Sequence, residues 1–161
     1  MDRVGAGYDE DFYAWTQSQA AELRRADAER DNRPIDWANV AEEIESMGRS
    51  QKSEIDSRLS VLLVHLLKWL FCPDLRDRCE RGWRLTIREQ RKKILREIKD
   101  SPSLRAYVVD AFVEAYDDSR LRAAVEADAP DGQFPNESPF TLDQALDPAY
   151  PPELFPPEGR V

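Results

Sequence analysis

Apolar residues recur every three or four positions along most of the chain, and this spacing is the period of an amphipathic α-helix. Two helix starts are well marked: Asp36 is suited to cap a helix, and Ser101 stands before Pro102, which favours the first helical position. Gly48 either ends the second helix or marks a hinge in a longer one. The first expected helix starts at Asp9 or Asp11 and ends near residue 28. The others span 36–48, a segment that ends near 71, 81–99 and 101–127, with a short one at 141–146.

The segment that ends near Phe71 carries the widest apolar surface. Its main row consists of Ile55, Leu59, Leu62, Leu66 and Trp69, and further leucines widen it. A helix that is apolar on more than one side is buried on more than one side, so this is the expected central helix. No long segment alternates with the period of two that marks a strand. The sequence therefore predicts an all-α fold: an up-and-down bundle of about five helices, a short C-terminal helix and a Pro-rich tail.

Composition changes after residue 129, because most of the 11 prolines lie beyond that point. We expect a helical bundle over residues 1–129 and a Pro-rich extension over 130–161, which together form a single domain. The extension either packs on the bundle or trails from it. It contains several large apolar side chains that are suited to docking: Phe134, Phe140, Tyr150, Leu154 and Phe155.

The formal net charge of −9 disfavours binding to nucleic acid or to an anionic membrane, because both repel the chain at long range. The charge is nevertheless uneven, since residues 76–99 contain 10 basic and 4 acidic side chains. This stripe either faces acidic neighbours and solvent or meets phosphate. The basic face of the helix over 81–99 consists of Arg81, Arg88, Lys92, Arg96 and Lys99.

Standard catalytic and cofactor-binding motifs are absent from the sequence. There is no Gly-rich phosphate-binding loop and no Glu-x-x-His motif of the kind found in di-iron bundles. Cys72 and Cys79 have six residues between them, which matches neither a zinc site nor a redox pair. We therefore expect no cofactor, no metal ion and no recognisable set of catalytic residues.

Two polar side chains fall among apolar ones. His65 is either a hydrogen-bonded histidine on a secondary packing face or a ligand or general base. Gln90 stands in the apolar row of Trp83, Ile87 and Ile94, where a buried amide needs partners. It is either a polar lock that fixes helix register or part of the lining of a cleft.

A third polar candidate is Glu43, which flanks the expected apolar row of Val40, Ile44 and Met47. A carboxylate at the rim of a buried face needs a partner if it is covered, and a bidentate arginine is the expected one. The arginines that could supply it are Arg84, Arg88 and Arg91.

Four blocks of sequence, taken together and in order, resemble the family catalogued as domain of unknown function number 29. They are Tyr8–Trp15 (YDEDFYAW), Ala41–Gly48 (AEEIESMG), His65–Trp69 (HLLKW) and Trp83–Arg91 (WRLTIREQR). The resemblance implies a small bacterial protein with a helical fold and no established activity, and it carries over no catalytic residues. It marks a candidate polar cluster within these blocks: Glu43, His65, Trp69, Trp83, Gln90 and Arg91.

Three functions stay open. The first is a non-enzymatic cytoplasmic module that binds another protein through a groove or the docked tail. The second is association with nucleic acid through the basic helix, and the third is a small enzyme or ligand-binding protein with Glu43, His65 and Arg91 around a cleft. We expect a cytoplasmic location and no membrane association, because the first residues lack an apolar core and the longest apolar run is too short to span a bilayer. A protein partner is expected, and self-association stays open.

Overall fold

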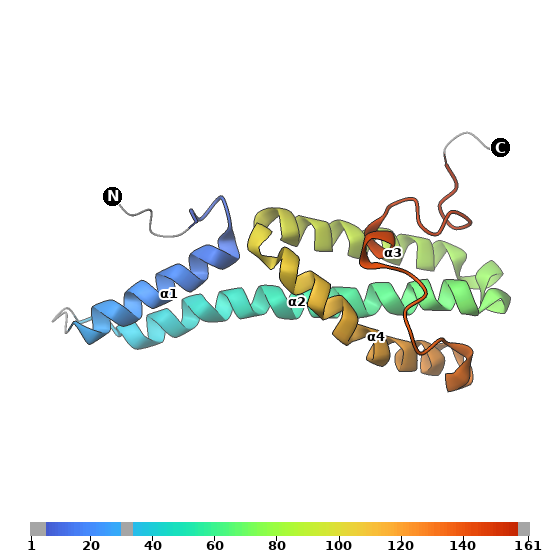
Figure 1. Ribbon diagram of the computed structural model, residues 1–161, viewed down its shortest axis with the longest axis horizontal. Helices are drawn as coiled ribbons and strands as arrows, with labels where there is room; N and C mark the ends of the chain where they lie inside the picture. The colour runs from blue at the N-terminus through green and yellow to red at the C-terminus, as the bar shows by residue number, and fades with distance from the viewer. Residues whose placement is uncertain (1–5, 30–33, 158–161) are drawn as a thin grey trace. The chain divides into compact units, whose positions relative to one another are not determined.

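The computed structural model describes residues 6–29 and 34–157. Within these residues the fold is all-α, as predicted, and contains no strand (Figure 1). Its helices are α1 (Phe12–Ala28), α2 (Trp37–Phe71), α3 (Arg76–Asp100), α4 (Arg105–Ala127) and the short α5 (Leu142–Leu146), with 3-10 turns at Pro73–Leu75, Pro102–Leu104 and Asp131–Gln133. None of the described helices combines the length and apolar character that a membrane crossing requires.

Helix α2 is a single helix of 35 residues. Of the two alternatives for Gly48, a helix end was therefore wrong, because the helix continues through this residue. Gly48 is buried inside the helix, where α1 approaches it closely. A Cβ at Gly48 would lie 2.6 Å from Oγ1 of Thr16 in α1. The glycine is therefore a site of close helix packing and not a helix end.

The chain divides into two compact units. The first unit comprises the residues up to 54 together with 97–107, and the second comprises 55–96 together with the residues from 108 onward. Helices α2, α3 and α4 each contribute to both units.

In the first unit, α1 packs on the N-terminal part of α2 through small residues. Thr16 and Ala20 of α1 are buried, as are Ala41 and Gly48 of α2. The predicted apolar row on this part of α2 was therefore wrong, because Val40 and Met47 are exposed. The small side chains sit at the interface because they let the two backbones come close together, which larger side chains would prevent.

The start of α1 is joined to the Pro102–Leu104 turn by Asp11. Its carboxylate caps α1 by accepting a 2.8 Å hydrogen bond from the Ala14 amide. It also accepts hydrogen bonds from the main-chain amide and the hydroxyl of Ser103, at 2.6 and 2.9 Å. Asp11 is thus buried but fully used as an acceptor, which is the condition for burying a carboxylate.

In the second unit, the C-terminal half of α2 forms the centre of the core, as predicted. Its side chains at 62, 63, 64, 66 and 67 have no exposed surface. Trp83, Ile87 and Ile94 of α3 are also buried. Helix α3 begins at Arg76, five residues before the expected start, because the helix follows directly on the turn that starts with Pro73.

The described part of the Pro-rich tail, red in Figure 1, leaves the end of α4 and returns along the second unit. Phe134, Phe140, Leu154 and Phe155 are buried. The hydroxyl of Tyr116 on α4 holds the tail by donating to the main-chain oxygens of residues 135 and 137, at 2.8 and 3.1 Å. Thr141 and Gln144 form a capping box at the start of α5.

Candidate functional site

Arg91 of α3 joins the basic helix to the tail. It is only 3% exposed. Its Nε donates a 2.7 Å hydrogen bond to the main-chain oxygen of Ala145, and its Nη2 donates a 2.6 Å hydrogen bond to that of Tyr150. The planar guanidinium group has its donors in a fixed fork, so one side chain satisfies two carbonyl groups of the tail.

The charge of Arg91 has no carboxylate partner within hydrogen-bonding distance among the described residues. Burial lowers its pKa to about 10, although Asp147 acts in the opposite direction. Its Nη1 is buried without a hydrogen-bond partner among the described residues. Arg91 is therefore a buried cation whose hydrogen bonds go to neutral carbonyls, and Asp147 acts on its charge through space only.

Phe155 of the tail packs beside two guanidinium groups. Its ring centre lies 5.3 Å from Arg88 Cζ and 5.2 Å from Arg91 Cζ, within the range of cation–π contacts. This contact fixes the end of the described tail against α3.

A groove with a volume of about 390 Å³ lies between α3 and the start of the returning tail. Helix α3 contributes both charge and apolar surface to its lining, whereas the tail contributes apolar surface only. The lining residues are Arg88, Arg91, Lys92, Leu95, Leu146 and Pro148.

All five residues of the predicted basic face are exposed. One of them, Arg88, also contacts the ring of Phe155. Arg81, Arg88, Lys92 and Arg96 belong to the second unit, whereas Lys99 belongs to the first. Lys92 and Arg96 also line a second hollow of about 320 Å³ with Glu89 and Lys93.

His65 is half-buried and its polar role is local. Its Nδ1 lies 2.8 Å from the carbonyl oxygen of Val61 in the preceding turn of α2, so Nδ1 carries the hydrogen and donates it. Burial has the largest effect on the pKa of His65 and lowers it. This hydrogen bond has the next largest effect and raises the pKa, but by less. The neutral imidazole therefore serves as a packed, hydrogen-bonded side chain.

Lys68 connects α2 with α4 beside His65. Its Nζ lies 2.7 Å from Oε2 of Glu126, and its ammonium group sits 5.7 Å from the ring centre of the buried Trp83. Arg122 supplies a second cation to the same carboxylate, at 2.8 Å. Burial raises the pKa of Glu126, but the hydrogen bonds and charges of Lys68 and Arg122 together outweigh it and hold that pKa below its ordinary value.

Two further members of the candidate cluster, Gln90 and Trp69, make contacts that hold the helices of the second unit in place. Gln90 accepts a 3.3 Å hydrogen bond from Arg58, which links α3 to α2 as a polar lock would. Trp69 lies under Arg76, whose Cζ is 4.6 Å from the ring centre and whose Nε donates to the Trp69 carbonyl oxygen.

The residues of the candidate polar cluster have different surroundings. Glu43 is exposed and belongs to the first unit, whereas the other five belong to the second. Of the arginines proposed as its partners, Arg84 pairs with Glu80 and Arg91 with tail carbonyls. His65 and Arg91 contact different elements, the former its own helix and the latter the tail.

Sequence reasoning missed the outer face of α4. Four aliphatic side chains on it are between 44% and 80% exposed: Val109, Val113, Leu121 and Val125. Their positions differ by multiples of four along one ridge of the helix, and the exposed Asp117 occupies the position between Val113 and Leu121. This spacing was the available signal, but it was overlooked because a stronger apolar row on the same helix accounts for the core.

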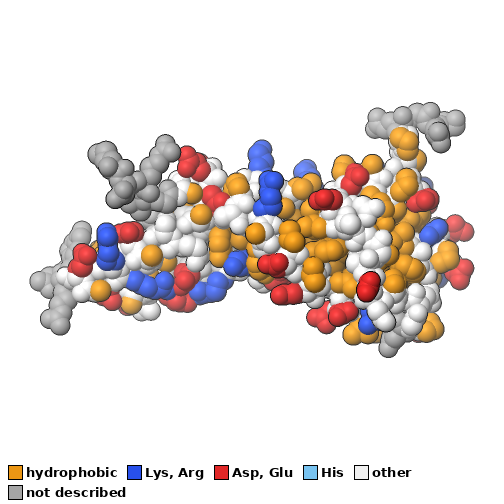
Figure 2. Space-filling view, viewed as in Figure 1, with side chains coloured by type: hydrophobic (Ala, Val, Ile, Leu, Met, Phe, Trp, Pro, Cys, Tyr) orange, Lys and Arg blue, Asp and Glu red, His pale blue; other side chains and the backbone are white. Residues whose placement is uncertain are grey.

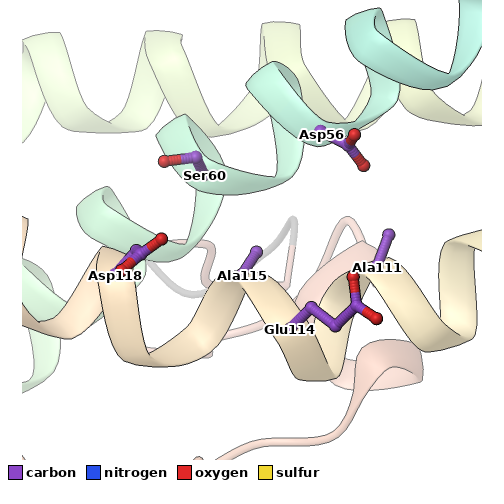
Figure 3. A pocket seen from close by; sticks show the side chains of 6 residues that line it. All are labelled: Asp56, Ser60, Ala111, Glu114, Ala115 and Asp118. Carbon is purple, nitrogen blue, oxygen red and sulfur yellow. The ribbon is translucent and has the colours of Figure 1, made fainter.

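Helix α4 also carries carboxylates that line a groove. A groove of about 240 Å³ between α2 and α4 is lined by Asp56 and Ser60 of α2 and by Glu114 and Asp118 of α4 (Figure 3). In Figure 2, the visible side of the second unit shows broad hydrophobic areas interrupted by acidic side chains. Within the described residues, no three His, Cys, Asp or Glu side chains are grouped so that they could hold a metal ion.

Comparison with known proteins gives a family and a fold. Residues 8–151 match the family described as Domain of unknown function DUF29. The chain belongs to this family. Among solved structures, this DUF29 chain is similar to an alpha-helical protein of unknown function from Rhodospirillum rubrum. The TM-score is 0.69 and the sequence identity 25%, over 88% of this chain and 90% of that one. No curated protein matches the chain.

Proposed function

We propose that this DUF29 protein is a non-enzymatic protein-interaction module that binds a positively charged partner through the outer face of α4. The observation that carries the proposal is the set of exposed aliphatic side chains on α4, a helix that also lines an acidic groove: Val109, Val113, Leu121 and Val125. Exposed apolar side chains interspersed with charged ones are a feature of protein-binding surfaces.

Charge specifies the kind of partner. Asp110, Glu114, Asp117 and Asp118 are exposed on the same helix, and the whole chain carries −9. A basic partner gains from both the local and the long-range field, which increases the association rate and selects against acidic proteins. A second copy of this face would instead bring like charges together.

A defined probe tests this. Fluorescence anisotropy would measure binding of a labelled amphipathic helical peptide made of Leu and Lys, with a Leu and Glu peptide of the same pattern for comparison. The Lys peptide should bind and the Glu peptide should not. The double variant Glu114→Lys and Asp118→Lys should weaken binding at least about tenfold. The matched control is Asp27→Lys with Glu43→Lys, which makes the same change in net charge on exposed residues of the first unit.

A further variant separates docking from simple charge attraction. Val113→Asp adds negative charge but removes one of the exposed aliphatic side chains of α4. Binding that is weakened by Val113→Asp supports the proposal. Binding that is unchanged or strengthened, or that falls equally in the control double variant, would show non-specific attraction to an acidic protein and would refute it.

The exposed cations around the second hollow of α3 favour nucleic acid as a second candidate. Filter binding of double-stranded DNA at low salt tests this idea with the triple variant Arg88→Glu, Lys92→Glu and Arg96→Glu. If DNA bound with a steep salt dependence and the triple variant abolished binding, the basic helix would be a nucleic-acid surface. Equal binding by both proteins would eliminate that function.

A further inference from the structure

The groove between α3 and the returning tail has one charged side and one apolar side. Arg88, Arg91 and Lys92 supply the charged side. The apolar side is formed by Leu95, which is 46% exposed, and by Leu146 and Pro148. We propose that this groove binds a small amphipathic anion, in which a carboxylate or phosphate group is joined to an apolar chain.

The buried charge of Arg91 is the first argument. Both of its described hydrogen bonds go to neutral main-chain oxygens, and Nη1 has no partner among the described residues. A cation that is removed from water and lacks a carboxylate partner attracts an anion more strongly than an exposed one does. Because Nη1 is itself buried, Arg91 acts through its charge, and the exposed Arg88 and Lys92 supply the donors that reach the ligand.

The size and lining of the groove are the second argument. Its volume of about 390 Å³ falls in the range of roughly 300–1,000 Å³ that is usual for small-molecule sites. On the tail side, Leu146 and Pro148 line the groove with apolar surface, whereas the intervening Asp147, which acts on the charge of Arg91, is not among the lining residues. The anionic head is therefore expected beside α3 and the apolar chain between Leu95 and the tail.

A soluble ligand fits this site better than a membrane surface. The chain as a whole carries −9, so an anionic bilayer would repel it while a small anion reaches the groove with little cost. This site is independent of the face proposed to bind a protein partner, because it uses α3 and the tail and not α4.

Isothermal titration calorimetry with decanoate and with decyl phosphate, both below their micelle-forming concentrations, tests the proposal. Both anions should bind the full chain, whereas decyltrimethylammonium, which has the same chain and the opposite charge, should not. Lys92→Glu should weaken decanoate binding at least about tenfold, since it replaces a lining cation by an anion. Lys93→Glu is the matched control, because Lys93 is the exposed neighbour that does not line this groove.

Other variants decide among the remaining outcomes. Leu95→Gln should weaken decanoate more than inorganic phosphate, because it removes only apolar contact. Glu114→Lys with Asp118→Lys on α4 should leave decanoate affinity unchanged, so failure of the protein-binding proposal would not affect this one. Absence of decanoate binding, equal loss in Lys93→Glu, or binding of phosphatidylglycerol vesicles in preference to free decanoate would overturn the proposal. Circular dichroism of each variant confirms that the helices are retained.

Discussion

Arg91 of α3 donates a 2.6 Å hydrogen bond to the main-chain oxygen of Tyr150, which lies 59 positions later in the chain. The acceptor is a peptide carbonyl, so the tail is held at this point by its backbone and not by the identity of a side chain. The same guanidinium holds Ala145, and together the two bonds place α5 and the following turn against α3. One buried side chain thus organises a segment that has few helical residues of its own.

Arg91→Lys is expected to loosen the tail. Lysine keeps the charge but lacks the planar fork, so it cannot serve both carbonyls at once. Loss of one charge-assisted hydrogen bond should reduce the free energy of unfolding by about 2 kcal/mol, as measured by urea denaturation. Limited proteolysis should also cut the tail sooner. Arg81→Lys, an exposed change on the same helix, should leave both measurements unaltered, and an equal effect in that control would contradict this role for Arg91.

Gly48 and Gly82 both lie inside helices but should respond in opposite ways to alanine. A Cβ at Gly48 meets Oγ1 of Thr16 at 2.6 Å, whereas a Cβ at Gly82 meets nothing within 4 Å. Gly48→Ala should destabilise the protein by about 1–3 kcal/mol through overpacking. Gly82→Ala should stabilise it by up to about 1 kcal/mol, because alanine is the better helix former. Thermal unfolding of the two variants checks the difference, and the same sign in both would contradict close packing at Gly48.

His65 should make stability depend on pH near neutrality. Because burial lowers its pKa in the folded protein below the ordinary value of 6.5, the unfolded chain binds the proton more readily. The free energy of unfolding should therefore decrease as the pH falls below 6.5 and stop decreasing once the folded pKa is passed. His65 is the only histidine in the sequence, so its NMR titration can be followed directly. In His65→Gln this pH dependence between 6.5 and the folded pKa should disappear; if it persists, another group is responsible.

Asp11→Ala should separate α1 from the Pro102–Leu104 turn. The substitution removes the cap of α1 and both hydrogen bonds from Ser103. Loss of an N-cap alone costs about 1 kcal/mol, and the unpaired Ser103 amide should increase this cost. Chemical denaturation measures the change. Asp9→Ala, at an exposed position two residues earlier, should have little effect, and a similar loss in both variants would show that general charge is responsible.

Local signals in the sequence predicted most helix boundaries correctly. Pro102 opens a 3-10 turn that leads into α4, Asp36 accepts a hydrogen bond from the Asn39 amide at the start of α2, and Thr141 caps α5. The width of the apolar surface between 55 and 71 also identified the central helix of the second unit. These features depend on neighbours within one or two helical turns, which a sequence shows directly.

The errors arose where contacts between distant residues decide the outcome. Gly48 has the local character of a helix end, but its contact with Thr16 makes it an interior residue of α2. Glu43 was placed at a buried rim because Val40 and Met47 were taken as the packed row, whereas α1 covers Ala41 and Gly48 instead. The carbonyl partners of Arg91 carry no side-chain signal, so a sequence cannot show them.

The docked tail also makes thiol labelling of the two cysteines a measure of how often the tail opens. Cys72 is buried at the end of α2, burial raises the pKa of its thiol, and Gln133 of the tail donates to the neighbouring carbonyl of Phe71. Cys79 is only partly covered. Since the thiolate is the reactive form, a thiol reagent reaches Cys72 at the rate at which this region opens. The ratio of labelling at the two cysteines therefore reports how often the tail leaves the core.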